Sequence, residues 1–371
     1  MRRRTFLQSA ALPALARAAV TDPQYKIHTP FPDKPGAGMP GRYPGTVVRV
    51  SSDKVLDEQS ERVDRAIAGQ MLNKGMCTLT GAKDPRDAWS SFISPSDVVG
   101  IKVNCSGSPN ILSNPELVGE IVGNLVSIGL KPSQICIYER FQDQLTNAHY
   151  EKVVPEGVSI IAVEGSRGSI IGYDPKTYVE VSFFGEDDTR SNLVRMVTER
   201  FTKIINVPNL KEHQAAGVTG CLKNIAYGNF SNVARSHQRE KTNTLSFIGT
   251  LASVEPLRSK TVLNVMDGFR CVWHGGPFST RKQYRFYAKQ LMIGTDPVSI
   301  DRMLIDVIEE KRKKEGASSV WDRSPEQLKG NPATDVKANH FIREPGHIEF
   351  AGRLGLGVYD KAKIQLKSVQ L

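Results

Sequence analysis

Residues 97–104 read DVVGIKVN, a short apolar run with a polar residue at each end. Such a run is typical of a strand that is buried on both faces of a sheet. Asn114 and Pro115 follow as a helix cap and a first helical residue, which predicts a helix that runs to Gly129. Residues 134–138, QICIY, predict the next strand. Because a helix is the usual connection between parallel strands, this order predicts two parallel neighbours.

The same alternation continues on both sides of this unit. Short apolar runs predict further strands at 46–50, 158–162, 203–207, 260–265, 290–294 and 362–366. Residues 57–73 predict a helix, with Val63, Ile67 and Met71 at fourfold spacing. A second helix is expected from 295–297 to about residue 314. The pattern predicts an α/β fold with a mainly parallel central sheet flanked by helices.

The last part of the chain has a weaker pattern. Residues 317–347 are polar and rich in turn residues, and they carry Trp321, His340 and His347. We expect them to form a C-terminal insertion over the sheet edge. Taken with the strands on either side, this gives a single α/β domain over residues 47–371.

Residues 1–18 have the three regions of a secretory signal peptide: a charged start, a short middle of apolar and small residues, and a closing Ala-Xaa-Ala. Within them, the run 3–7, RRTFL, resembles the twin-arginine export motif. A basic first helix and an uncleaved anchor are the alternatives, although the stretch is short for a membrane span. We therefore expect export by the twin-arginine machinery to the periplasm or outside the cell, with no membrane association after cleavage.

Residues 19–46 are rich in proline and glycine, which predicts an extended linker or surface arm. The 39% hydrophobic content is enough for a folded core and excludes global disorder. The net charge is +10, and +6 remains once the four arginines of residues 1–18 are removed. This mildly basic balance suits a small anionic partner but is too weak to favour nucleic acid.

The cysteines give no metal-cluster pattern. They are Cys77, Cys105, Cys136, Cys221 and Cys271, and no two of them have Cys-x-x-Cys spacing. We therefore expect no iron–sulfur cluster. Cys105 and Cys221 each lie next to a polar motif, where they can be nucleophiles, a disulfide pair or small buried thiols, and the last of these is favoured.

Polar motifs lie where the predicted strands end. They are Lys102 with Asn104, residues 209–213, and Asp267 with Gly268. In sheets of this type, ligands bind beyond the carboxyl ends of the strands. These three motifs therefore mark the candidate site.

The densest polar cluster begins directly after the strand at 203–207. Lys211 and His213 are two residues apart, so an extended backbone directs both side chains to one face. Lys223 follows in an otherwise small and apolar segment. Because lysine is rarely buried without a partner, Lys223 must reach a water-filled cavity or an anion. His237 completes the cluster.

Two kinds of site fit these residues. In the first, lysines hold a small anionic molecule and histidines exchange protons, and the catalytic candidates are Lys211, Lys223, His213 and His237. The residues expected to bind or orient the ligand are Lys102, Asn104, Asn209 and Asn224. In the second, a divalent transition metal is bound by His213, His237, Asp267 and His274. The cofactor is therefore left open.

Several of these motifs, in this order, resemble the family catalogued as domain of unknown function 362. They are KVN at 102–104, NVPNLKEH at 206–213, GCLKN at 220–224, His237, MDG at 266–268, GGP at 275–277 and GTDPVSID at 294–301. The resemblance covers roughly residues 95–310. It implies the fold and the motif positions but no reaction. Some relatives carry a ferredoxin-type cluster segment, which this sequence lacks.

These observations lead to one hypothesis with two alternatives. The leading hypothesis is an exported enzyme of unassigned reaction that binds a small anionic ligand in a Lys/His pocket, with metal assistance in one version. The first alternative is a periplasmic ligand-binding or cofactor-carrier protein without turnover. The second is a redox protein with a single metal ion. An enzyme should lose turnover when His213 or His237 becomes Gln, whereas a carrier should need the lysines instead.

Overall fold

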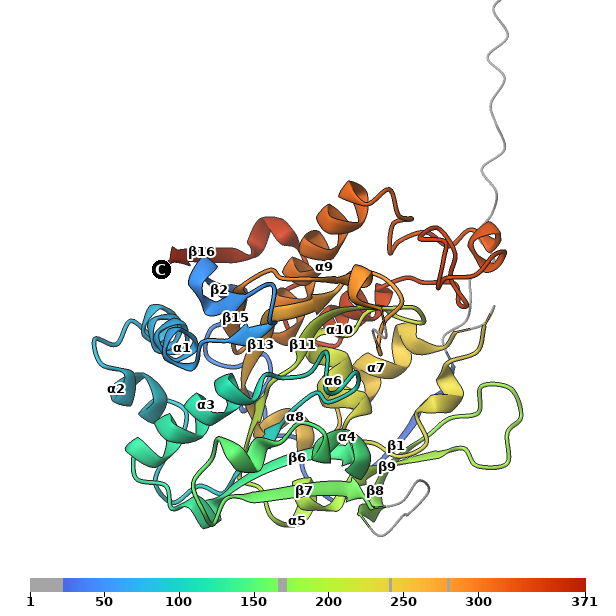
Figure 1. The fold of residues 1–371 in the computed structure, drawn as a ribbon. Helices are drawn as coiled ribbons and strands as arrows, with labels where there is room; N and C mark the ends of the chain where they lie inside the picture. Colours follow the sequence, from blue (N-terminus) through green and yellow to red (C-terminus); the bar gives the residue numbers. More distant parts are fainter. Residues whose placement is uncertain (1–22, 166–171, 240–241, 279–280) are drawn as a thin grey trace, which may run out of the picture.

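The computed structural model describes residues 23–165, 172–239, 242–278 and 281–371 (Figure 1). The expected signal peptide, residues 1–18, lies outside the described residues. A long sheet crosses the molecule, and helices lie on both of its faces. Among the described residues, no helix has the length and apolar character needed to cross a membrane.

The strands of the long sheet follow the order β16-β2-β15-β13-β10-β5-β6-β7. Their bounds, in this order, are Gln365–Gln370, Thr46–Ser51, Gln290–Gly294, Thr261–Val272, Lys203–Asn206, Val99–Lys102, Ile135–Phe141 and Ser159–Glu164. β15 is antiparallel to both of its neighbours, and every other pair along this path is parallel. The prediction of a mainly parallel sheet is confirmed.

Shorter strands extend or flank this sheet. β11 (Asn209–His213) and β14 (Arg285–Phe286) both pair with β13, and β12 (Gly217–Val218) pairs with β11. A separate three-stranded sheet contains β1 (Lys26–His28), β8 (Tyr173–Glu180) and β9 (Arg190–Val194). A two-stranded sheet joins β3 (Leu56–Asp57) and β4 (Arg62–Val63).

Helices cover the two faces of the long sheet (Figure 1). Those between β2 and β7 in the chain are α1 (Arg65–Thr80), α2 (Pro85–Ser90), α3 (Pro115–Ser127) and α4 (Gln142–Thr146). The later ones are α5 (Arg195–Glu199), α6 (Gly220–Tyr227), α7 (Thr244–Ala252), α8 (Leu257–Lys260), α9 (Pro297–Lys314) and α10 (Gly346–Arg353). α1 and α3 pack on one face, and α6, α7, α9 and α10 pack together on the other.

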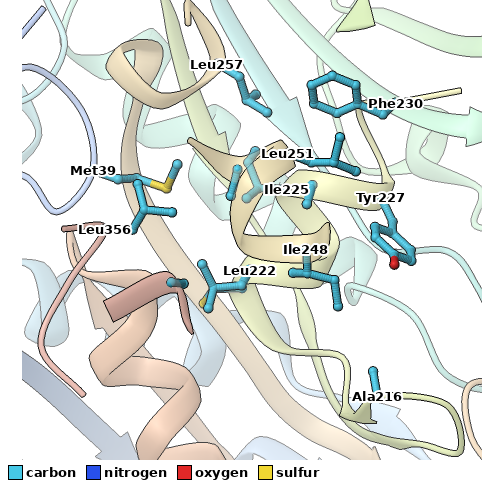
Figure 2. Close-up of a cluster of buried hydrophobic side chains, with 14 of the residues drawn as sticks. Met39, Ala216, Leu222, Ile225, Tyr227, Phe230, Ile248, Leu251, Leu257 and Leu356 are labelled. Carbon is cyan, nitrogen blue, oxygen red and sulfur yellow. The ribbon is translucent and has the colours of Figure 1, made fainter. Parts of the chain in front are cut away.

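The alternation of residues along each strand fills two hydrophobic cores, one on each face. In β6, Ile135 and Ile137 face the core under α1 and α3, whereas Cys136 and Tyr138 face the core under α6 and α7. Figure 2 shows part of the second core, where Leu222 of α6 lies near Ile248 of α7. Because both faces are covered, the strands read as continuous apolar runs in the sequence.

The first helix begins later than the spacing of Val63, Ile67 and Met71 predicts. β3 and β4 occupy the beginning of the predicted segment 57–73. The side chain of Asp64 then caps α1 by accepting a hydrogen bond from the Ile67 backbone at 3.0 Å. The cap fixes the start of the helix, since it satisfies a backbone donor that has no partner inside the helix.

The proline- and glycine-rich segment is more ordered than a free arm in its described part, residues 23–46. Lys26–His28 forms β1 and pairs with β8. Farther along, the Met39 side chain is fully buried in the core under α6 and α7 (Figure 2). This segment therefore contributes to the packing of the domain.

The C-terminal insertion, residues 317–347, packs beside the end of β11. The Asn339 side chain donates to the backbone oxygen of Gln214 at 3.0 Å, and Arg343 forms a buried ion pair with Glu212 at 3.6 Å. Long-range polar contacts of this kind leave no periodic pattern in the sequence, which is why the position was not predicted.

Candidate functional site

A cavity of about 480 Å³ lies beyond the carboxyl ends of β5, β6 and β10. This size is within the range of about 300–1,000 Å³ that is common for small-molecule sites. Lysine and arginine side chains from four places in the chain line it, namely Lys102, Arg140, Lys211 and Lys223. Glu139 is the acidic residue among the lining residues. The cavity is therefore electropositive, as a site for an anion must be.

One side of the cavity, the strand wall, consists of Lys102, Asn104, Glu139 and Lys211. Lys102 is fully buried, and its Nζ donates to Glu139 Oε1 at 2.8 Å and to the Val103 backbone oxygen at 2.6 Å. The second oxygen of Glu139 accepts from the Cys105 backbone at 3.0 Å. A Cβ on Gly228 would lie 2.2 Å from Lys102 Cε, so only glycine leaves room for this lysine. Lys102 is thus a paired cation.

Lys211 is held on the strand wall by two oxygen acceptors. It lies on β11, is fully buried, and donates to Asn104 Oδ1 at 2.7 Å and to the Ser106 backbone oxygen. Burial lowers the pKa of Lys211 to about 7, although the nearby Glu139 carboxylate opposes this change. An ammonium has three N–H donors, so one remains for a ligand.

A chain of asparagine side chains positions Lys211. Asn104 Nδ2 donates to Asn224 Oδ1 at 3.0 Å, Asn224 Nδ2 donates to Asn206 Oδ1 at 2.8 Å, and Asn206 Nδ2 donates to Asn264 Oδ1 at 2.8 Å. The last member donates to the Thr295 backbone oxygen at 3.3 Å. Asn104 and Asn224 line the cavity, but their amides are used within this chain. The asparagine chain therefore orients Lys211. The sequence did not indicate that Asn206 and Asn264 belong to this chain.

Another part of the lining, the helix wall, consists of Lys223, Tyr227 and His237. Asp301 fixes the helix α6 that carries the first two, because its carboxylate accepts from the backbones of Cys221 at 2.6 Å and Leu222 at 2.9 Å. These are donors of the first helical turn, which otherwise have no partner. α6 is therefore held at the end that lies nearest β11.

Lys223 is the unpaired cation of the site. Its side chain is only 9% exposed, and within the described residues its Nζ makes no hydrogen bond and no ion pair. The nitrogen lies over the ring of Tyr227, 4.6 Å from the centroid. Burial lowers the pKa of Lys223 to about 7, and the positive charges of Lys211 and Arg140 lower it further. The prediction that this lysine reaches a cavity is consistent with this geometry.

The two predicted histidines lie side by side at the cavity, with ring centroids 5.3 Å apart. His213 Nδ1 accepts from the Ala215 backbone at 3.1 Å, so the proton of the neutral ring is on Nε2. Burial holds the pKa of His213 well below its usual value and lowers that of His237 to about 3, with Lys223 contributing in each case. Both rings are therefore neutral at pH 7.

Three predicted residues do not reach the cavity. Asn209 Nδ2 donates to the backbone oxygens of Leu112 and Arg270, and Asp267 Oδ2 accepts from the Asn114 backbone at 2.6 Å. His274 lies between Arg312 and the Pro332 backbone oxygen. β13 continues to Val272 instead of ending before Asp267, so Asp267 is inside the strand pairing and not at its end.

The predicted set of metal ligands is consequently not assembled. His213 and His237 are together, but Asp267 and His274 make their contacts elsewhere. In the described part of the chain, no group of three or more His, Cys, Asp and Glu side chains is placed to hold a metal ion.

The described cysteines are free thiols, so Cys105 and Cys221 do not form the disulfide pair that we considered. Both are fully buried, and burial raises the pKa of each well above its usual value. A thiol with a raised pKa is a poor nucleophile. The structure therefore favours the interpretation as small buried thiols.

Sequence reasoning missed a residue that joins the remaining parts of the site. Glu212 lies between Lys211 and His213 on β11, and its Oε2 accepts from the Gly276 backbone at 2.8 Å. Its other oxygen forms the ion pair with Arg343. The two segments held in this way also line the cavity, one through Pro277 and Phe278 and the other through Phe341. Together with Phe141 they give the electropositive cavity an apolar side.

A sequence model described as domain of unknown function (DUF362) matches residues 99–306, which is more than half of the chain. The chain belongs to the DUF362 family. The match includes the strand wall and the helix wall, so both halves of the cavity lie within the family's domain.

No curated protein matches the chain in sequence. A solved structure from Thermotoga maritima, a structural-genomics target, is similar with a TM-score of 0.36 and 11% identity. The likeness covers 68% of this DUF362 chain and 59% of the Thermotoga protein.

Proposed function

We propose that the cavity binds a small organic anion with an apolar body and that the protein is an enzyme acting on it. Lys211 and Lys223, which both line the cavity, hold the anionic group. Phe141 and Phe341 contact the apolar part, and the neutral rings of His213 and His237 lie close enough to donate to or accept from the ligand. The four residues predicted to bind a metal do not lie together among the described residues. The metal-assisted version is therefore not part of the proposal.

The observation that carries the proposal is the unpaired nitrogen of Lys223. A buried ammonium without an acceptor is costly, and a protein retains one where a ligand supplies the missing charge. Lys102 gives the contrast, because this buried lysine forms an ion pair with Glu139. The absence of such a carboxylate beside Lys223, within the described residues, supports an anion as the partner.

The structure modifies the chemical roles that the sequence suggested. Histidines with pKa values far below neutrality are weak bases, whereas the two lysines have pKa values of about 7. A group is most effective in proton transfer when its pKa lies near the working pH. We therefore assign proton exchange to the lysines and hydrogen-bond donation to His213 Nε2.

The binding step can be tested with 3-phenylpropionate, which has a carboxylate and an aromatic ring. Calorimetry should show binding at pH 7, and the dissociation constant should rise about tenfold per pH unit above 7 for each lysine that must be protonated. Lys223→Met should abolish binding, and Lys74→Met, an exposed lysine on α1, should not. Equal binding by wild type and Lys223→Met would overturn the proposal.

Turnover can be separated from simple carriage by exchange in deuterated water. An enzyme that moves protons should exchange a C–H hydrogen of a bound carboxylate that carries an acidic hydrogen, such as phenylpyruvate, faster than buffer does. His213→Gln should slow this exchange while the ligand still binds. Tight binding with no exchange above the buffer rate would favour the carrier alternative.

We also propose that the protein is exported through the twin-arginine machinery. The proposal rests on the leader residues 1–18, with Arg3 and Arg4 before Phe6 and Leu7. Fractionation of cells that produce the full chain should find it in the periplasm, and replacement of both arginines by lysine should retain it in the cytoplasm. Unchanged location of this variant would contradict the route.

A further inference from the structure

The three cavity lysines differ in what their nitrogen atoms touch. Lys102 and Lys211 each donate to two oxygen acceptors. Lys223 has no hydrogen-bond acceptor among the described residues, and its nitrogen lies over the face of Tyr227. Loss of a proton therefore breaks no hydrogen bond at Lys223, whereas it weakens two at either of the others.

We propose that Lys223 forms an imine with a carbonyl-bearing organic anion of the 2-oxo acid type. The inference rests on the proposed function, because it uses the same cavity and the same ligand class. With a ligand that carries a carbonyl, Lys211 alone keeps the carboxylate through its remaining N–H donor, and Lys223 loses its proton and reaches the carbonyl carbon. The aromatic side chains near the cavity favour a 2-oxo acid with an apolar or aromatic side chain.

The surroundings of Lys223 favour its neutral, nucleophilic form. A lysine becomes an effective nucleophile when it is desolvated or lies near another cation, since both disfavour the charged form. Both conditions apply here: the side chain is almost completely buried, and Lys211 and Arg140 act on its charge. The pKa of about 7 gives a large neutral fraction at physiological pH.

The step balances without a cofactor. The Lys223 nitrogen lone pair attacks the carbonyl carbon and forms a C–N bond, while the carbonyl electrons move to oxygen. That oxygen then leaves as water with both hydrogens of the amine, and the C=N double bond closes. Nothing is oxidised or reduced, so no co-reactant is needed.

Reductive trapping tests the inference. The full-length mature protein is incubated at pH 7 with phenylpyruvate and cyanoborohydride, and intact-mass spectrometry should show one added phenylpyruvate less one oxygen atom. Peptide mapping should place the adduct on Lys223. Omitting phenylpyruvate should give no adduct, and an excess of 3-phenylpropionate, which lacks the carbonyl, should suppress it by competition.

Matched variants separate the imine from binding. Lys223→Arg keeps the positive charge but cannot form an imine, so it should bind 3-phenylpropionate and give no adduct. Lys74→Arg should be labelled like wild type. An adduct of equal yield in Lys223→Arg would overturn the inference, and so would binding of 3-phenylpropionate by the wild type without any trapped phenylpyruvate. That last result would leave the proposed function standing, whereas failure of the wild type to bind either acid would overturn both.

If circular dichroism showed that Lys223→Arg is unfolded, competition between phenylpyruvate and 3-phenylpropionate in the wild type would still test the imine. Specific labelling at Lys223 must fall as 3-phenylpropionate occupies the cavity. Labelling that is spread over exposed lysines, or that the competitor does not reduce, would overturn the inference without any variant.

Discussion

The strand wall and the helix wall of the cavity bury lysines to a similar degree but treat their charges differently. On the strand wall, Lys102 faces Glu139, and Lys211 donates to Asn104 at the end of a chain of asparagines. On the helix wall, Lys223 has only the face of Tyr227. Both lysines of the strand wall thus have oxygen acceptors within the protein, whereas Lys223 on the helix wall has none among the described residues.

This difference should be measurable in the free energy of unfolding. Removal of one partner of a buried ion pair is strongly destabilising, whereas removal of a buried charge that has no partner relieves a cost. Replacement of a lysine should therefore have opposite effects on the two walls. The following predictions use that opposition.

The largest effect is expected for Lys102→Met. The change leaves the buried Glu139 carboxylate without its cation, which should lower the free energy of unfolding by about 3–5 kcal/mol. Urea denaturation followed by circular dichroism measures this loss. The double variant Lys102→Met with Glu139→Gln should be more stable than the single variants together suggest, because the two residues interact directly. Additive losses would show that the pair is not coupled.

Much of the strand wall could be predicted from the sequence. The end of β5 was recognisable because its residues form a buried apolar run, and the first motif follows directly from it. Glu139 was not recognised, since its role depends on the register that places Lys102 opposite Tyr138 in the neighbouring strand. Such a register is set by the whole sheet and leaves no local trace in the sequence.

β11 shows the opposite limit. Its sequence NLKEH lacks the apolar run by which strands are recognised, yet every residue of it is buried. Its charged side chains interact with distant segments of the chain; Glu212, for example, forms an ion pair with Arg343. Lys211 and His213 were nevertheless predicted to share a face, because that inference needed only an extended backbone. The helix wall was predicted through Lys223, since a lysine in an apolar segment signals an unusual environment.

The second effect, of opposite sign, is expected for Lys223→Met in the ligand-free protein. Methionine keeps the apolar stem and removes the unpaired charge, so the free energy of unfolding should rise at pH 6 by about 1–3 kcal/mol, the usual cost of burying a polar group without a partner. Thermal unfolding of wild type and variant from pH 6 to pH 10 measures the gain. Lys74→Met serves as the control for loss of a surface charge.

The pH dependence of that gain has a definite sign. The pKa of Lys223 is about 7 in the folded chain and has its ordinary value of 10.5 in the unfolded chain. Below pH 7 both forms carry the proton, and the folded form bears the full cost of the buried ammonium. Between pH 7 and pH 10.5 the unfolded chain binds more protons than the folded chain, so the stability of the wild type rises with pH. The difference in stability between Lys223→Met and the wild type therefore shrinks. If the gain in the free energy of unfolding did not change with pH, better packing of methionine would be its cause instead of the lost charge.

The smallest effect concerns the aromatic ring that stands in for a counter-charge on the helix wall. A cation over an aromatic face gains about 0.5–1 kcal/mol at modest desolvation, which corresponds to roughly two- to fivefold in the protonation equilibrium of Lys223. Tyr227→Leu should therefore weaken binding of 3-phenylpropionate at pH 7 by roughly 1.5- to threefold, because Lys223 is about half protonated in the wild type and less of it is protonated in the variant. Tyr227→Phe keeps the ring and loses only the hydrogen bond to Ser236, so its affinity should stay close to that of wild type. Equal weakening by Leu and Phe would instead assign the effect to that hydrogen bond, and the helix wall would then hold Lys223 with no contribution from the ring.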